Sequence, residues 1–235
     1  MNPSTYRDVT RFLSRIGVDT RFLSIFDGNI YINNQRFSRF TSKRQELFTK
    51  NFSNFTIHKS KVFQKICTRA SRVLAKSLKP GEKIFIPEND KCSTIVLDMI
   101  LEPYTRKYGI KIFKGDDMDH KIDSIALPLT LDDEAENVVN CLLNGNKIEV
   151  YHLMNDYSTE YQTKIIYPLQ NVPCKWIKSW MEKLDQECKY SRFKSVETVT
   201  LDFLEDFIPD VRENILKSAL FISEEFVSDK KIKKS

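Results

Sequence analysis

After residue 81, short apolar runs alternate with helical patterns, and this alternation limits the folds that the chain can adopt. The runs KIFI, IKIF and SIALPL (residues 83–86, 110–113 and 124–129) have the length of buried strands. The segment STIVLDMILEPYTRKY, between the first two runs, has helical periodicity. So does DDEAENVVNCLLNG, which follows the third run. Strands that alternate with helices favour right-handed crossovers. The sequence therefore predicts an α/β fold, a mostly parallel sheet with helices on both faces.

The rest of the chain divides around this core. Residues 1–26 suit a short amphipathic helix broken at Gly17, and DGNIYINNQRF alternates like a hairpin that begins at the turn Asp27-Gly28. A helical pattern then covers about residues 43–78 and stops at a Lys-Pro-Gly sequence. KIEVYHLM and TKIIYPL are further strand candidates, and the chain is largely helical from Pro173. We expect a basic N-terminal region over residues 1–78, an α/β core over 79–180, and a helical extension over 181–235 whose last residues, SDKKIKKS, form a disordered basic tail.

Charge separates the same parts of the chain. Residues 1–79 hold 16 Lys and Arg against 4 Asp and Glu, whereas the remainder holds 21 against 28. Such asymmetry is typical of a nucleic-acid surface, because cations that neutralise phosphates release counterions; a solvated face or an acidic protein neighbour is the alternative. The candidate RNA contacts are Arg36, Arg39, Lys43 and Arg44, and a helix face of Lys61, Lys65, Arg69, Arg72 and Lys76.

Aromatic residues are interleaved with the first of these groups. Phe37 and Phe40 could present rings to unstacked bases. Because they are three residues apart, they could equally form one stripe facing the core. We favour the cations as RNA contacts and leave the rings open.

The five cysteines do not form a recognisable metal or disulfide pattern. They are odd in number and widely scattered, without a CxxC pair, and the chain has 3 histidines. We expect no metal site, no disulfide framework and mostly buried apolar thiols. Cys188, between Lys183 and Lys189 in sequence, and Cys92, at a predicted helix N-terminus, are candidate reactive thiols because positive charge favours the thiolate. A purely structural role is the alternative for each.

No stretch of sequence suggests a membrane protein. The chain contains no run near the roughly 18 apolar residues of a membrane span. Its first residues, MNPSTYRDVTRF, lack the apolar run of a signal peptide. We expect a cytoplasmic protein without membrane contact.

Three segments, in chain order, resemble the PP-loop or N-type ATP pyrophosphatases. Their loop S-G-G-x-D-S-T after the first strand corresponds to Glu88-Asn-Asp-Lys-Cys-Ser-Thr94, and LDDEAENVVNCLLNG is similar to their G-H-N-x-D-D-x-A-E-T-V-x-x-N-L-L-R-G. The segment IIYPLQNVPCKWIKSWMEKLDQECKYSRFKS is similar to a P-L, V-P-x-K and E-C-x-Y-S element of the tRNA-thiolating branch. The resemblance covers roughly residues 79–220 and implies the PP-loop fold.

The departures from the family pattern are concentrated in the ATP loop. An active loop aims backbone N–H groups at phosphates through glycines, which this loop lacks. Glu88 and Asp90 would repel phosphates, and Cys92 stands in place of the family's acidic residue. We therefore expect no working ATP site and no cofactor of this chain's own. The altered loop comprises Glu88, Asn89, Asp90, Lys91, Cys92, Ser93 and Thr94.

The second and third motifs are also incomplete. Asp132 and Asp133 match acids that help hold nucleotide or metal in active relatives, but Pro128-Leu129-Thr130 replaces the family's G-H-N. We expect both acids to cap the helix at its positive end and Glu136 to be packed or solvated. Thiolating relatives also use a cysteine after the third strand. KGDDMDHKID has none, which leaves Cys188 without that implied partner.

A PP-loop framework around an altered loop resembles the non-catalytic second subunits of cytosolic tRNA 2-thiolation complexes. The resemblance implies a heterodimer with an intact, ATP-binding PP-loop thiolase and contact with tRNA. One alternative is a divergent enzyme that still adenylates a tRNA base with Lys91 and Ser93 at the phosphates. The other is an RNA-binding or assembly module that reuses the fold.

Overall fold

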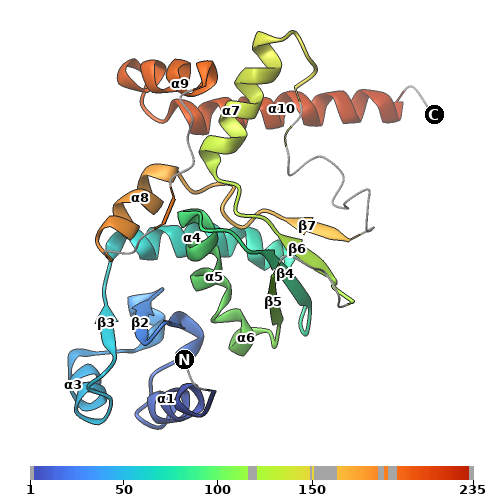
Figure 1. The fold of residues 1–235 in the computed structure, drawn as a ribbon. Coiled ribbons are helices and arrows are strands. Elements are labelled where there is room, and N and C mark those ends of the chain that lie inside the picture. Colours follow the sequence, from blue (N-terminus) through green and yellow to red (C-terminus); the bar gives the residue numbers. More distant parts are fainter. Residues whose placement is uncertain are drawn as a thin grey trace.

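The structure is a computed structural model that describes residues 3–115, 121–148, 150, 163–184, 188–189 and 195–232. Figure 1 shows a sheet with helices packed around it, the N-terminal elements at one end of the view and α7, α9 and α10 at the other. Within the described residues, no helix has both the length and the apolar character that crossing a membrane requires.

The central sheet has four parallel strands in the order β5-β4-β6-β7. Ile84 and Ile86 of β4 are buried, as expected for an inner strand of a parallel sheet. This sheet confirms the predicted α/β fold. Its strands are β4 (Lys83–Pro87), β5 (Lys111–Gly115), β6 (Ser124–Ala126) and β7 (Lys164–Ile166).

Helices connect and cover these strands. Ser60 caps α4 by accepting a hydrogen bond from the N–H of Phe63, and the helix ends before the Lys-Pro-Gly stop. The helical pattern predicted after β4 is divided at Pro103, whose ring nitrogen carries no proton for a helical hydrogen bond. The helices are α4 (Lys61–Ser77), α5 (Cys92–Leu101), α6 (Tyr104–Lys107), α7 (Leu131–Leu143), α8 (Cys174–Glu182), α9 (Val196–Phe207) and α10 (Val211–Ile232).

The N-terminal elements form a second, smaller sheet. A hairpin forms at the predicted turn, with Asp27 (φ 45°) and Gly28 (φ 70°) between antiparallel strands β1 and β2. Its first strand corrects the prediction of a helix over residues 1–26, because α1 ends at Arg15 and pairing with β2 holds residues 23–26 extended. The end of the predicted hairpin, QRF, belongs to α2 instead. A third strand, β3, pairs with β2 in parallel. The elements are α1 (Pro3–Arg15), η1 (Thr20–Phe22), β1 (Leu23–Phe26), β2 (Asn29–Ile32), α2 (Gln35–Ser38), α3 (Ser42–Asn51) and β3 (Thr56–His58).

Strand β3 corrects the prediction of a helical segment over residues 43–78. The phenylalanines of that segment do face inward, but Phe48 and Phe52 lie on and just after α3, whereas Phe55 follows a turn. Backbone pairing with β2 determines the conformation of residues 56–58. The helical spacing of the aromatic residues was therefore coincidental beyond residue 52.

Two hydrophobic cores meet along β2. Residues of α1, β1, β2 and α3 form one core, while Tyr31 of β2 belongs to the main core with α4, α5 and α8. Tyr31 packs edge-on against Trp180 with ring centroids 5.7 Å apart. The apolar face of α4 lies in the main core. The proposed division at residues 78 and 180 stays a prediction.

At the C-terminus, α10 continues through Ile232 and so includes residues predicted to be a disordered tail. The last three residues of that tail lie outside the described residues. Most of the strand candidate KIEVYHLM also lies outside them, and its described residues 147, 148 and 150 are not in a strand.

Candidate functional site

The loop after β4 is held by hydrogen bonds of its own. Asn89 Oδ1 accepts from the N–H of Lys91 at 3.0 Å and from Thr94 Oγ1 at 2.5 Å. The N–H of Thr94 in turn donates to the carbonyl of Lys91 at 3.0 Å. The side chain of Asn89 thus holds the turn together, and neither Asn89 nor Asp90 has a positive φ.

A distant segment lies against this loop. Cys188 forms a disulfide with Cys92, the first residue of α5. The N–H of Lys189 donates to the carbonyl of Asp90 at 2.9 Å, and the N–H of Cys92 donates to the carbonyl of Lys189 at 3.3 Å. Lys189 Nζ also pairs with Asp90 Oδ2 at 2.5 Å. We call this arrangement the closed loop.

The disulfide corrects two predictions. A disulfide was not expected from five scattered cysteines, and Cys188 and Cys92 were candidate reactive thiols, whereas bonded to each other neither is a free thiol. The partner of Cys188 is Cys92, the first residue of α5. The two cysteines are 96 positions apart in sequence, and the fold brings them together at the loop.

The described residues of the closed loop do not fit the phosphates of ATP. The N–H of Cys92, at the positive end of α5, is already bound to Lys189. The hydrogen bond from Lys189 lowers the pKa of Asp90, so this exposed carboxylate carries its negative charge at neutral pH. Glu88 is exposed on the same loop, as is Lys91, while Ser93 is half-buried. Occupied donors and fixed negative charge both oppose phosphate binding.

The acids of the second motif have separate structural roles. Asp133 completes a capping box with Thr130 at the start of α7, as expected. Asp132 is buried instead, accepts from the N–H of Cys174 at the start of α8, and pairs with Arg212 of α10 at 3.1 Å. Glu136, one turn further along α7, is half-buried. The prediction of capping is thus confirmed for Asp133 and wrong for Asp132.

Most of the predicted RNA contacts are exposed. Arg36, Arg39 and Lys43 face solvent, and Arg44 donates to the carbonyl of Arg39 at 2.6 Å. Phe37 is 53% exposed whereas Phe40 is fully buried, so only Phe37 could meet a base. On α4, the exposed members of the predicted face are Lys61, Lys65, Arg72 and Lys76.

Arg69 differs from its neighbours on α4. It pairs with Glu213 of α10 at 2.7 Å and donates to the carbonyl of Asn171 at 2.8 Å. Its guanidinium also lies 4.3 Å from the ring centroid of Trp176 on α8. These contacts join three helices, so we infer that Arg69 has a structural role.

The structure also assembles arginines that sequence reasoning missed. A hollow of about 780 Å³ beside α1 and η1 is lined by Arg39 together with Arg7, Arg11, Arg21 and Arg106. We call it the arginine groove. The spacing of Arg7 and Arg11, one helical turn apart on an amphipathic helix, was the one local signal for it.

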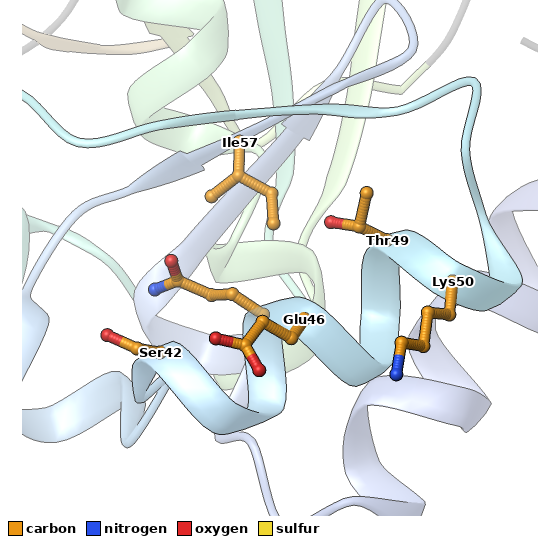
Figure 2. A pocket seen from close by; sticks show the side chains of 6 residues that line it. Ser42, Glu46, Thr49, Lys50 and Ile57 are labelled. Carbon is orange, nitrogen blue, oxygen red and sulfur yellow. The ribbon is translucent and has the colours of Figure 1, made fainter.

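A second hollow, of about 580 Å³, lies between α3 and β3. Figure 2 shows side chains of α3 along it, with Ile57 of β3 opposite. Its lining consists of Ser42, Gln45, Glu46, Thr49, Lys50 and Ile57. This lining holds neither a cysteine nor a histidine, and we assign it no chemistry.

Comparison with known proteins bears on the fold. The sequence matches no protein-family model and no curated protein. Among solved structures, the chain is similar to the U34-tRNA thiolase NcsA from Methanococcus maripaludis with its [4Fe-4S] cluster, with a TM-score of 0.54 and 16% identity over 69% of this chain and 79% of that chain. The chain shares the fold of this thiolase. At this identity the likeness establishes the fold alone, and it agrees with the predicted PP-loop architecture.

The described residues do not fit an iron–sulfur cluster. Such clusters are generally held by several cysteine thiolates. Cys92 and Cys188 are joined to each other, while Cys67, Cys141 and Cys174 lie on three different helices. Burial raises the pKa of Cys67 far above its usual range. No group of three metal-ligating side chains occurs within the described ranges.

Proposed function

We propose that this chain is a non-catalytic subunit of a tRNA wobble-uridine 2-thiolation complex. It supports an intact PP-loop thiolase, which binds ATP, and it contributes part of the tRNA-binding surface. The fold shared with a U34-tRNA thiolase supports the choice of pathway. This chain's own role is structural and RNA-binding.

The closed loop is the observation that carries this proposal. Phosphate transfer requires free donors aimed at the developing charge. Here the loop presents Asp90 and Glu88 to solvent, and the N–H of Cys92 is bound to Lys189. The chain thus has the strand, loop and helix of the PP-loop fold, but the loop N–H of Cys92 is not free to bind phosphate. A partner with an open loop would then have to supply the chemistry.

Affinity purification followed by native mass spectrometry tests this proposal. The tagged protein is isolated gently from its own cells, and the mass and ratio of co-purifying molecules are determined. We expect a stoichiometric complex with a protein that carries an intact S-G-G-x-D-S loop, together with tRNA. Recovery of a lone protein or a homodimer would contradict the proposal.

An RNA-binding module of another pathway is a second candidate, favoured by the exposed cations of the N-terminal elements and α4. These cations do not depend on the closed loop. Deleting the gene and measuring 2-thiouridine in bulk tRNA by mass spectrometry separates the candidates. Loss of the wobble sulfur supports the thiolation subunit, whereas unchanged sulfur favours the independent module.

A further inference from the structure

The arginine groove collects five guanidinium groups from four separate segments. Arg7 and Arg11 come from one face of α1, Arg21 from η1, Arg39 from the end of α2, and Arg106 from α6. Arg7, Arg11, Arg21 and Arg39 are exposed. A search by local sequence would not group them, because 99 positions separate the first from the last.

The charge of the groove is only partly compensated. Asp19 is its acidic lining residue, and Arg21 already holds it through two hydrogen bonds of 3.0 and 2.8 Å. Arg106 is paired with Glu102. Among the described residues, no ion pair involves Arg7, Arg11 or Arg39. The hydrogen bond from Arg21 is the largest cause of the lowered pKa of Asp19, and the charge of Arg39 adds to that lowering. The five guanidiniums face two carboxylates, those of Asp19 and Glu102, which leaves three positive charges in excess.

This concentration of charge opposes folding. Like charges one helical turn apart, such as Arg7 and Arg11, destabilise a helix. Arg39 adopts a left-handed backbone conformation (φ 55°), which is uncommon for a residue with a Cβ. The repulsion between Arg7 and Arg11 is relieved if these arginines bind an anion, whereas the conformation of Arg39 is the left-handed cap that ends α2.

The groove is firmly built. The N–H of Asp19 donates to the carbonyl of Ser38 at 2.8 Å, which fixes η1 against α2. Arg106 donates to the carbonyls of Thr20 and Leu23 at 3.0 and 2.6 Å, which fixes α6 against the same turn. The backbone that carries the guanidiniums is therefore preformed, and a ligand has to order only the exposed arginine side chains.

We propose that the arginine groove binds consecutive phosphates of an RNA backbone. Guanidinium groups recognise phosphates through paired N–H donors, and several guanidiniums along an open hollow suit a repeating anion. The exposed ring of Phe37, packed on Phe22 of η1 with centroids 5.3 Å apart, offers a stacking surface on the same two elements as Arg21 and Arg39. The identity of that RNA as tRNA rests on the proposed function.

Fluorescence anisotropy with a labelled tRNA transcript tests the groove. The triple variant Arg7→Gln, Arg11→Gln, Arg39→Gln is compared with Lys147→Gln, Lys183→Gln, Lys217→Gln, which removes the same charge from exposed positions elsewhere. We expect the groove variant to bind more than about tenfold more weakly. Its slope of log affinity against log salt concentration should fall by about 2, since each phosphate contact contributes roughly 0.7. The control should bind nearly as well as the native protein.

A charge-preserving variant strengthens the test. Replacing Arg7, Arg11 and Arg39 by lysine keeps the charge but loses the paired donors, so affinity should fall while most of the salt slope remains. Equal losses in the groove variant and its control would overturn the proposal. So would loss of binding to anionic lipid vesicles with unchanged RNA binding.

Failure of the groove and failure of the proposed function are distinguishable. If the groove variant binds RNA normally, the proposed RNA-binding role of the groove is wrong, and the proposed complex with a thiolase is not affected. Conversely, a groove that binds RNA in a cell whose wobble sulfur does not depend on this protein supports the groove and contradicts the thiolation role.

Discussion

Cys92 and Cys188 are bonded to each other where the loop after β4 meets the first residue of α5. The bond and the flanking hydrogen bonds of Lys189 hold residues 188 and 189 against the loop between β4 and α5. Cys92 therefore closes the loop, at a position where the resemblance to PP-loop enzymes would place an acidic residue. This relationship leads to the first two predictions.

Replacing Cys188 by serine should destabilise the oxidised protein. In the chain-entropy model, a disulfide that closes a loop of about this length stabilises the folded state by roughly 4–5 kcal/mol. We expect the free energy of unfolding of Cys188→Ser to be lower by up to about 4 kcal/mol. Urea denaturation in oxidising buffer measures it.

Reduction provides the matched control. A dithiol reductant converts the disulfide to two thiols and is itself oxidised to a disulfide, so native protein and Cys188→Ser should then unfold alike. The same free energy of unfolding for both proteins in oxidising buffer would show that the bond does not form in solution.

Opening the disulfide should not restore ATP binding. After reduction, Lys189 still bonds to Asp90 and Cys92 through the backbone, and Asp90 and Glu88 still carry charge. We expect isothermal titration calorimetry to detect no micromolar ATP binding by the native protein, reduced or oxidised. Micromolar binding that is abolished by Lys91→Ala or Ser93→Ala would instead support the divergent enzyme.

Local patterns in the sequence were sufficient for most of the fold. The apolar runs at β4, β5 and β6 are long enough to mark buried strands, and the turn Asp27-Gly28 marks its hairpin because few residues tolerate a positive φ. Strand β1 was assigned to a helix because Phe22, Leu23 and Ile25 also fit a helical pattern, and strand β3 was missed because three residues are too few to show alternation. Its conformation depends on pairing with β2, which no local pattern encodes.

The candidate site depended more on tertiary structure. The altered loop could be found from its missing glycines, but its closure could not, because Cys92 and Cys188 meet only in the folded chain. Likewise, Asp132 and Asp133 are adjacent in sequence, yet one faces Arg212 and the other the helix start. The arginine groove needed four segments to be placed together.

Removing the carboxylate of Asp132 should destabilise the fold strongly. Its side chain and that of Arg212 are 8% and 6% exposed, so Asp132→Ala leaves a buried guanidinium and the N–H of Cys174 with one partner fewer. Breaking a buried ion pair typically costs about 3–5 kcal/mol. We expect about 3 kcal/mol, because Asp202 and Glu205 still neutralise Arg212.

Asp133→Ala is the comparison for Asp132→Ala. It removes only the capping box, so thermal or urea unfolding should show a loss of about 1 kcal/mol. Equal losses for the two variants would contradict the assigned roles.

Deprotonation of Tyr6 should lower the stability of the folded protein at high pH. Burial, followed by the nearby charge of Glu102, raises the pKa of Tyr6 to about 12 from its ordinary value of 10.0. Between these values the unfolded chain releases a proton that the folded chain keeps, so the free energy of unfolding decreases as pH rises. Tyr6→Phe should be less stable at neutral pH, because Glu102 loses a hydrogen bond of 2.6 Å, but should show a shallower decline from pH 10 to 12. Parallel declines would contradict this.

Substitutions at Arg69 and Arg72, both on α4, should have different effects: the first on stability and the second on RNA binding. Arg69→Gln loses the ion pair with Glu213 and the stacking on Trp176, so we expect the free energy of unfolding to fall by about 1–2 kcal/mol. Arg72→Gln, at an exposed position, should change it by less than about 0.5 kcal/mol. If the exposed face of α4 contacts phosphates, Arg72→Gln weakens tRNA binding and lowers its salt slope, whereas Arg69→Gln does not. Urea unfolding and fluorescence anisotropy are measured on both variants. Weaker tRNA binding by Arg69→Gln, with normal binding by Arg72→Gln, would show that Arg69 contacts the RNA.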